Sequence, residues 1–140
     1  MKGIEIQCRR LLGEIREQVA RALFRNTVTD LFGRLKSPRK RVMSARHVQL
    51  LNLLLEHEEM TLGEIQHLTV HLYALKNPDK ALARDLNYLI GLDTMSGRRL
   101  EDQTVMLKIN LQWPTQITDT EFFRLVKALP KGKLHGFLSS

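Results

Sequence analysis

The phrase ALARDLNYLIGL, residues 81–92, carries polar side chains at spacings that could bind a nucleic acid. Apolar residues recur in it at helical spacing and would form the buried side of a helix: Leu82, Leu86, Leu89 and Ile90. The outward residues are then Asn77, Lys80, Ala83, Arg84 and Asn87. An outward arginine can form two hydrogen bonds with a guanine or clamp a phosphate, and an outward asparagine can read an adenine. The candidate DNA contacts in this helix are therefore Asn77, Lys80, Arg84 and Asn87.

A structural role is the alternative for the charged pair in this helix. Arg84 and Asp85 could pair with neighbouring elements and hold the domain together, and Arg84 would then not be free for DNA. Asp79 also places a negative charge near the start of the helix, where a DNA phosphate would otherwise lie. The residues alone leave both roles open.

Two other groups of basic residues could contact a phosphate backbone. The stretch 31–47 contains no acid and holds the densest basic run of the chain, in which the candidate contacts are Arg39, Lys40, Arg41 and Arg46. Its alternative role is that of a solvated linker. Arg98 and Arg99 form the second group, but Glu101 and Asp102 follow directly and nearly cancel their charge. The second group is therefore the weaker signal.

The chain offers little that indicates catalysis or a metal site. His67 and His71 are one helical turn apart and Glu64 is a turn earlier, a spacing at which two imidazoles and a carboxylate could share a metal. No HExxH phrase, cysteine or further acid closes such a site, so we expect histidines on a helix surface. Nucleophile–base phrases and paired carboxylates in a glycine-rich setting are missing too. We expect neither an enzyme nor a metal or other cofactor.

The composition is typical of a globular protein with an anionic partner. The 140 residues are 43% hydrophobic and 26% charged, with a formal net charge of +7. This excess favours a nucleic acid or an acidic protein face as partner. Cys8 is the single cysteine, so no internal disulfide can form, and we expect its side chain to be buried or half-buried. Because a signal-peptide core and an apolar run of roughly 20 residues are both missing, we expect a cytoplasmic protein with no membrane contact.

Helical periodicity dominates the first 35 residues. Apolar residues recur there in steps of three and four, from Ile4 to Leu35. Residues 26–29, with the sequence NTVT, have weak helix propensity and predict a break or a cap between two helices. A helix of this length must lie against something, which could be its own domain, a second copy of the chain or a missing domain.

Start signals for three more helices follow. Ser44 is placed to cap a helix over 45–57. Thr61 and Glu64 have the spacing of a capping box, which opens an amphipathic helix over 62–75. Asn77-Pro78 opens a third helix over 78–90, because proline suits the first helical position, and Gly91 ends it.

The period changes after Gly91. Residues 104–111 alternate around β-prone side chains and predict a strand, paired with 92–95 in a hairpin whose turn is at Ser96-Gly97 and whose tip carries Arg98 and Arg99. Trp113 is expected to cover the edge of a small core. A last short helix, capped at Thr118 or Asp119, would bury one of the adjacent rings of Phe122 and Phe123 and leave the other exposed.

Three helices followed by a two-stranded hairpin is the order of a winged helix-turn-helix. The sequence thus predicts a mainly α fold with a small β-hairpin, a winged helix-turn-helix preceded by a long N-terminal helix. Its expected parts are an amphipathic helical segment with a basic linker (1–43), the winged helix-turn-helix (44–113) and an extension with a short helix (114–140).

The phrases SARHVQLLNLLLEHEEMTLGEIQHL and ALARDLNYLIGL resemble the winged-helix module found at the C-terminal end of many Fic-family proteins. ARALFRNTVTDLFGRLK is similar to the helical linker that precedes this module, and LKINLQWPTQITDTEFFRLVKALP to the ends of some of these chains, so the resemblance covers about residues 20–135. The RDL phrase is equally similar to repressors of the DeoR type. The catalytic His-Pro-Phe phrase and Gly-Asn-Gly-Arg loop of the Fic domain are missing from this chain.

The resemblance implies two functions of different classes. One is a DNA-binding module, similar to a transcription regulator or to an accessory domain of a Fic-type protein. The other is a non-catalytic protein-interaction or dimerisation module that positions a Fic-type enzyme. Ala81 and Ala83 depart from the family pattern, which usually has Ser, Thr or Arg there, and favour weak or non-specific DNA reading. The expected partners are DNA, a second copy of the chain through the N-terminal helix, and a Fic catalytic domain.

Overall fold

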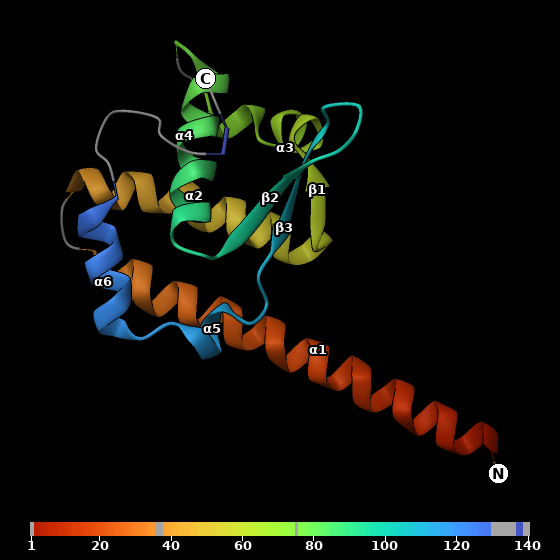
Figure 1. Cartoon of the computed structure of the whole chain (residues 1–140). Coiled ribbons are helices and arrows are strands. Elements are labelled where there is room, and N and C mark those ends of the chain that lie inside the picture. The colour runs from red at the N-terminus through yellow and green to blue at the C-terminus, as the bar shows by residue number, and fades with distance from the viewer. Residues whose placement is uncertain (1, 36–37, 75, 130–136, 139–140) are drawn as a thin grey trace.

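The computed structural model describes residues 2–35, 38–74, 76–129 and 137–138. The helices are α1 (Lys2–Gly33), α2 (Pro38–His57), α3 (Leu62–Leu68), the 3-10 turn η1 (Val70–Leu72), α4 (Pro78–Gly91), α5 (Trp113–Gln116) and α6 (Asp119–Ala128). The strands β1 (Glu59–Thr61), β2 (Met95–Arg99) and β3 (Val105–Ile109) form one antiparallel sheet in the order β1-β3-β2. The expected fold class is confirmed: this is a mainly α winged helix-turn-helix preceded by a long helix (Figure 1).

Helix α1 is continuous, so the break expected at residues 26–29 is wrong. The hydroxyl of Thr27 donates to the carbonyl oxygen of Leu23 at 2.8 Å, and that of Thr29 to Arg25 at 2.9 Å. Both threonines therefore satisfy their polar groups inside the helix and do not compete with it. The N-terminal part of α1 projects away from the rest of the fold (Figure 1).

Helix α2 starts at Pro38, and the cap expected at Ser44 is wrong. Proline has no amide hydrogen to lose and its φ already suits the first helical turn. A proline within a helical pattern can equally interrupt a helix, so Pro38 alone does not mark this start. The basic residues 39–41 consequently belong to the first turns of a helix and not to a linker.

The helix-turn-helix is formed by α3 and α4. The capping box is confirmed, since the amide of Glu64 donates to the Thr61 hydroxyl and the Thr61 amide donates to Glu64, both at 3.1 Å. Helix α3 ends at Leu68 and not at residue 75, and the chain continues with 3-10 hydrogen bonds, in which the Leu72 amide donates to the Thr69 carbonyl oxygen at 2.9 Å. The turn η1 then leads to α4, whose start at Pro78 and end at Gly91 agree with the expectation.

The hairpin is longer than expected and turns later. Gly97 lies within β2 opposite Leu107, and the chain reverses in residues 100–104, where Asp102 accepts a hydrogen bond from the Thr104 amide at 3.0 Å. A hydrogen bond from a backbone amide to a nearby Asp side chain stabilises a turn, so the turn forms here and not at Ser96-Gly97. Strand β1 was not expected from the sequence; its three residues pair with β3 from Thr61↔Met106 to Glu59↔Lys108.

One hydrophobic core contains residues of every α-helix and of all three strands. The C-terminal half of α1 is built into it through Phe24, Val28, Leu31 and Phe32, all at most 3% exposed. Trp113 is buried as expected, with its ring centroid 5.5 Å from that of Phe24, and the rings of Phe32 and Phe122 are 5.2 Å apart. Residues of all three expected segments therefore share this core.

The structure also decides the expectations for Cys8 and for the two adjacent phenylalanines. Cys8 is exposed on the projecting part of α1, so the expectation of a buried cysteine is wrong. Of the two adjacent rings, Phe122 is fully buried and Phe123 is half-buried. No helix within the described residues is both long and apolar enough to span a membrane.

Candidate nucleic-acid interface

Helix α4 presents an exposed basic stripe on the winged-helix framework. Its buried side packs through Leu82, Leu86 and Leu89. Lys80 and Arg84 are one turn apart on the exposed side, in line with Asn77, which is exposed just before the helix. Within the described part of the chain, neither Lys80 nor Arg84 forms an ion pair. These two cations are therefore available to an anionic ligand.

Ala83 was expected to face outward and does not. Ala83 is 9% exposed and belongs to the hydrophobic core, as does Leu82 before it. The buried arc of α4 is wider than the leucine spacing alone suggested, because it also takes up Asp85. Ala83 is accordingly not part of the exposed side of α4.

Asp85 anchors α4 to the rest of the fold through a buried hydrogen-bond network. The carboxylate is 2% exposed and accepts hydrogen bonds from Arg46 Nε at 3.0 Å and from the Tyr73 hydroxyl at 2.5 Å. His47 Nε2 lies 3.2 Å from the other carboxylate oxygen. The His47 ring stacks on Tyr88, with 4.7 Å between centroids. The network ties α4 to α2 and to the residue after η1, and so fixes the direction of the exposed stripe.

The network also controls the ionisation of its members. Burial alone would raise the pKa of Asp85, but the hydrogen bonds and charge from His47, together with the Tyr73 and Arg46 bonds, hold that pKa below the ordinary value. Burial and the adjacent Asp85 carboxylate raise the pKa of Tyr73. Burial raises the pKa of Tyr88 to about 12. Asp85 therefore stays ionised and acts as the shared acceptor of the network.

The structure places Arg46 in this network and not at an open surface. Its guanidinium binds Asp85 and lies over the Tyr73 ring, 5.4 Å from the centroid. The structural alternative of the sequence analysis thus holds for Asp85, with Arg46 as partner, whereas Arg84 remains exposed. The side chains of Arg39, Lys40 and Arg41 lie outside the described residues.

Leu138 binds the side chain of Asn87, one turn after Arg84 on α4. The Asn87 side-chain amide donates to the Leu138 carbonyl oxygen at 2.7 Å, and the Leu138 amide donates back to Asn87 Oδ1 at 2.9 Å. The Asn87 side chain uses here the same donor and the same acceptor with which an asparagine binds adenine. Base reading by Asn87 would therefore require Leu138 to leave.

The wing is partly engaged by the neighbouring residue Phe137. Arg98 forms an ion pair with Glu59 of β1. The Arg99 guanidinium lies over the Phe137 ring, 5.4 Å from the centroid. That ring packs so closely on Gly97 that a Cβ there would come within 2.7 Å of it, which accounts for a glycine inside the strand. Arg98 and Arg99 stand at the end of β2, just before the tip where they were expected.

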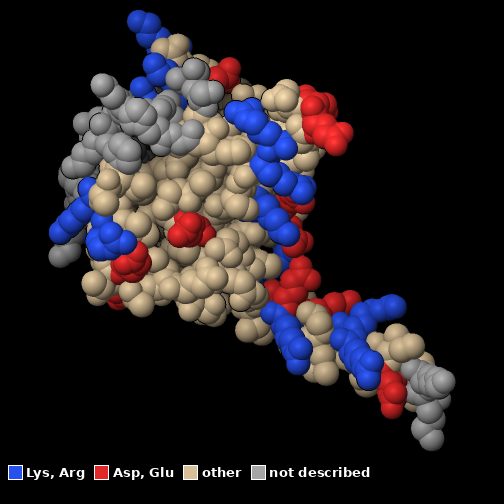
Figure 2. All heavy atoms as spheres, in the orientation of Figure 1, with Lys and Arg blue, Asp and Glu red and all other residues tan. Residues whose placement is uncertain are grey.

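Basic side chains are unevenly distributed over the surface. Figure 2 shows Lys and Arg at the top of the molecule, where α4 begins, and in a column on the side of the hairpin. Lys76 and Lys108, which the sequence analysis did not select, are exposed next to α4 and on β3. Lysines of this kind carry no sequence signal that separates them from other surface lysines.

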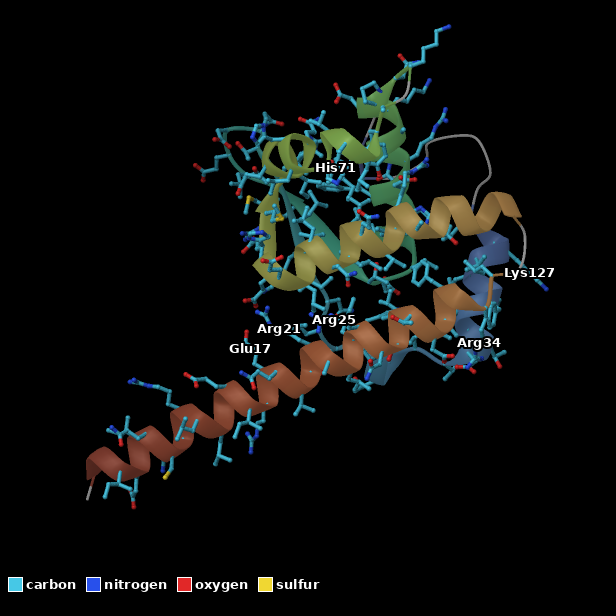
Figure 3. The ribbon with its side chains drawn as sticks, turned by 180° about the vertical axis from the view of Figure 1, so that it is seen from behind. Glu17, Arg21, Arg25, Arg34, His71 and Lys127 are labelled. Carbon is cyan, nitrogen blue, oxygen red and sulfur yellow. The ribbon has the colours of Figure 1, made fainter. Side chains whose placement is uncertain are left out.

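The histidines considered for a metal do not share a helix. His67 is on α3 and His71 on η1, because the helix ends between them, and both are exposed. His71 is labelled in Figure 3. Among the described residues no group of three His, Cys, Asp or Glu side chains is positioned to hold a metal ion.

Comparisons with protein-family models, with curated proteins and with solved structures find no match for this chain.

Proposed function

We propose that this chain is a winged-helix DNA-binding module in which α4 enters the major groove. The observation that carries the proposal is the exposed pair Lys80 and Arg84, unpaired within the described chain and held on α4 by the buried Asp85 network. In a winged helix-turn-helix this helix is the one that meets base edges and phosphates. The net charge of +7 supports an anionic partner.

The proposed binding is mainly to the phosphate backbone. Lys80 and Arg84 would contact phosphates or guanines, and Arg99 and Arg98 would lie along the backbone beside the groove. Asn87 is engaged by Leu138, and Asp79 is an exposed acid in the first turn of α4. These features support weak or sequence-tolerant binding, because few side chains of α4 are left to read base edges.

The second candidate function is a non-catalytic module that binds a protein, such as the Fic-type enzyme suggested by the resemblance. Two exposed apolar residues favour it: Leu68, the last residue of α3, is 44% exposed, and Val70, the first of η1, is 68% exposed. Exposed apolar side chains that cluster at a surface often mark a protein contact. A module of this class would not need the cations of α4.

Substituting both cations of α4 tests the first function. The Lys80→Ala/Arg84→Ala variant is expected to bind a random-sequence duplex about tenfold or more weakly at 50 mM salt, because each lost contact costs of the order of 1 kcal/mol or more. The measurement is fluorescence anisotropy with a labelled duplex. Both positions are exposed, so thermal unfolding should be unchanged.

Arg25→Ala/Lys127→Ala is the matched control. It removes the same number of positive charges from exposed positions on α1 and α6, away from α4 (Figure 3). Binding by this control should stay close to that of the natural chain. If the two variants weaken binding equally, only the net charge matters and α4 is not the interface.

A further inference from the structure

The projecting part of α1 carries an exposed apolar stripe. Six side chains that are 44–65% exposed belong to it: Ile4, Leu11, Leu12, Ile15, Val19 and Leu23. With 3.6 residues per turn, these six fall within an arc of about 120° and extend over about 28 Å of the helix axis. Isolated exposed apolar residues are ordinary, but an ordered stripe of this length indicates a contact surface.

The stripe lies on the side of α1 that faces away from the rest of the chain. By the same helical spacing, the buried residues Phe24, Val28 and Leu31 are centred about 180° from it. Arg21, on the buried side, donates to the Leu55 carbonyl oxygen of α2 at 2.7 Å. Figure 3 shows Glu17, Arg21 and Arg25 on the side of α1 turned toward the body of the fold. The described part of this chain therefore leaves the stripe uncovered.

The spacing of the stripe fits a second helix. Residues 4, 8, 11, 15, 19 and 22, all apolar or cysteine, follow one another in steps of three and four. Such steps, sustained over nearly three heptads, form the seam at which one helix packs its side chains between those of another. The body of the fold lies on the opposite side, so a helix could lie along the stripe without touching it.

The charges around the stripe fit a second copy of α1. Residues 2–20 carry four bases and three acids, a nearly balanced mixture, whereas a helix lying on an anionic membrane is rich in Lys and Arg on its polar face. Glu5 and Arg16 are on the same border of the stripe. In an antiparallel pair centred between Arg10 and Leu11, Glu5 of each copy would lie opposite Arg16 of the other, giving two matched ion pairs.

We propose that α1 pairs antiparallel with α1 of a second copy through this stripe, so that the chain is a homodimer. The same patch serves both partners, as in the two-fold symmetric contacts that most homo-oligomers use. A stripe of this length would form an interface at the small end of the stable range. The dimer is independent of the proposed DNA binding, since the stripe and the α4 cations are on different elements.

Sedimentation equilibrium of the full chain at about 100 µM, where contacts with micromolar constants are occupied, tests the dimer. The natural chain should have twice the 16.2 kDa mass of one chain. The Leu11→Glu/Ile15→Glu variant should have the single mass, because four carboxylates would be placed in the seam of each pair. Circular dichroism and thermal unfolding check that both remain folded, which is expected since both positions are exposed.

Ile6→Glu provides the matched control. Ile6 is 58% exposed, like the residues of the stripe, but lies on the opposite side of the same helix segment. Its substitution should leave the dimer intact. A single-chain mass for the natural protein would overturn the proposal, and so would a Leu11→Glu/Ile15→Glu variant that keeps the double mass or an Ile6→Glu variant that loses it.

Cys8 tests the orientation of the pair. In the antiparallel arrangement the two Cys8 residues are about five residues apart along the axis, beyond the roughly 7 Å between Cα atoms that a disulfide tolerates. The dimer should therefore remain free of a covalent link under mild oxidation with copper phenanthroline. Rapid formation of a disulfide-linked dimer would show a parallel pair and contradict the proposed orientation.

Discussion

Replacing Asp85 with alanine is expected to lower the free energy of unfolding by about 3–5 kcal/mol, the usual cost of removing one partner from a buried charged group. Asp85 is the common acceptor for Arg46, His47 and Tyr73, and it is 2% exposed. Without it, His47 and the Tyr73 hydroxyl would be buried with no acceptor, and the half-buried Arg46 would lose its ion pair. Denaturant titration followed by circular dichroism measures the change.

Asp79→Ala is the control for this substitution. Asp79 is an acid in the same helix, but it is exposed and forms no ion pair within the described residues. Its loss should change stability far less. If the free energy of unfolding of Asp85→Ala is within about 1 kcal/mol of that of the natural chain, the network does not hold α4 in place.

The contribution of Asp85 should depend on pH. The pKa of Asp85 in the folded chain is below its ordinary value, which is about 3.9 in an unfolded peptide. The stabilisation is therefore fully present above about pH 4 and is lost as the pH falls through the folded pKa. Asp85→Asn has no titrating group there, so the stability difference between the natural chain and this variant should shrink below pH 4. A difference that stays constant down to pH 2 would contradict the assigned shift.

The affinity of the natural chain for duplex DNA should fall steeply with salt. Three to four phosphate contacts by the basic residues of α4 and β2 give a slope of log affinity against log salt of about −2.7 to −3.6, hence about a 40- to 150-fold loss between 50 and 200 mM. The reason is that each neutralised phosphate releases a condensed counterion. Anisotropy titrations at four salt concentrations give the slope. An affinity that does not change with salt would exclude a backbone-dominated interface.

The elements with local signals were predicted well from the sequence. Thr61 and Glu64 specify the start of α3 through bonds three residues apart, and Pro78 with Gly91 marks both ends of α4. The start of α2 was misjudged, because one residue there carries two opposite signals. Pro38 can interrupt a helix or begin one, and the choice depends on the packing of α2, which the sequence does not state.

The candidate site was predicted in part, and its limits have physical causes. Lys80 and Arg84 follow from helical spacing alone, because the leucines of α4 fix its buried side. Asp85 lies outside the arc that the leucines mark, so helical spacing does not reveal its burial, and its partners Arg46, His47 and Tyr73 are 12–39 residues away in the sequence. The contact of Leu138 with Asn87 spans 51 residues and has no local signature. Long-range pairing of this kind arises only in the folded chain.

The change in salt slope on removing the α4 cations tests the central claim most directly. Lys80→Ala/Arg84→Ala should make the slope shallower by about 1.8, because two phosphate contacts are lost. Arg25→Ala/Lys127→Ala should leave the slope as it is in the natural chain. If the natural chain fails to bind the duplex at 50 mM salt, or if the slope of Lys80→Ala/Arg84→Ala equals that of the natural chain, α4 is not a DNA-binding helix.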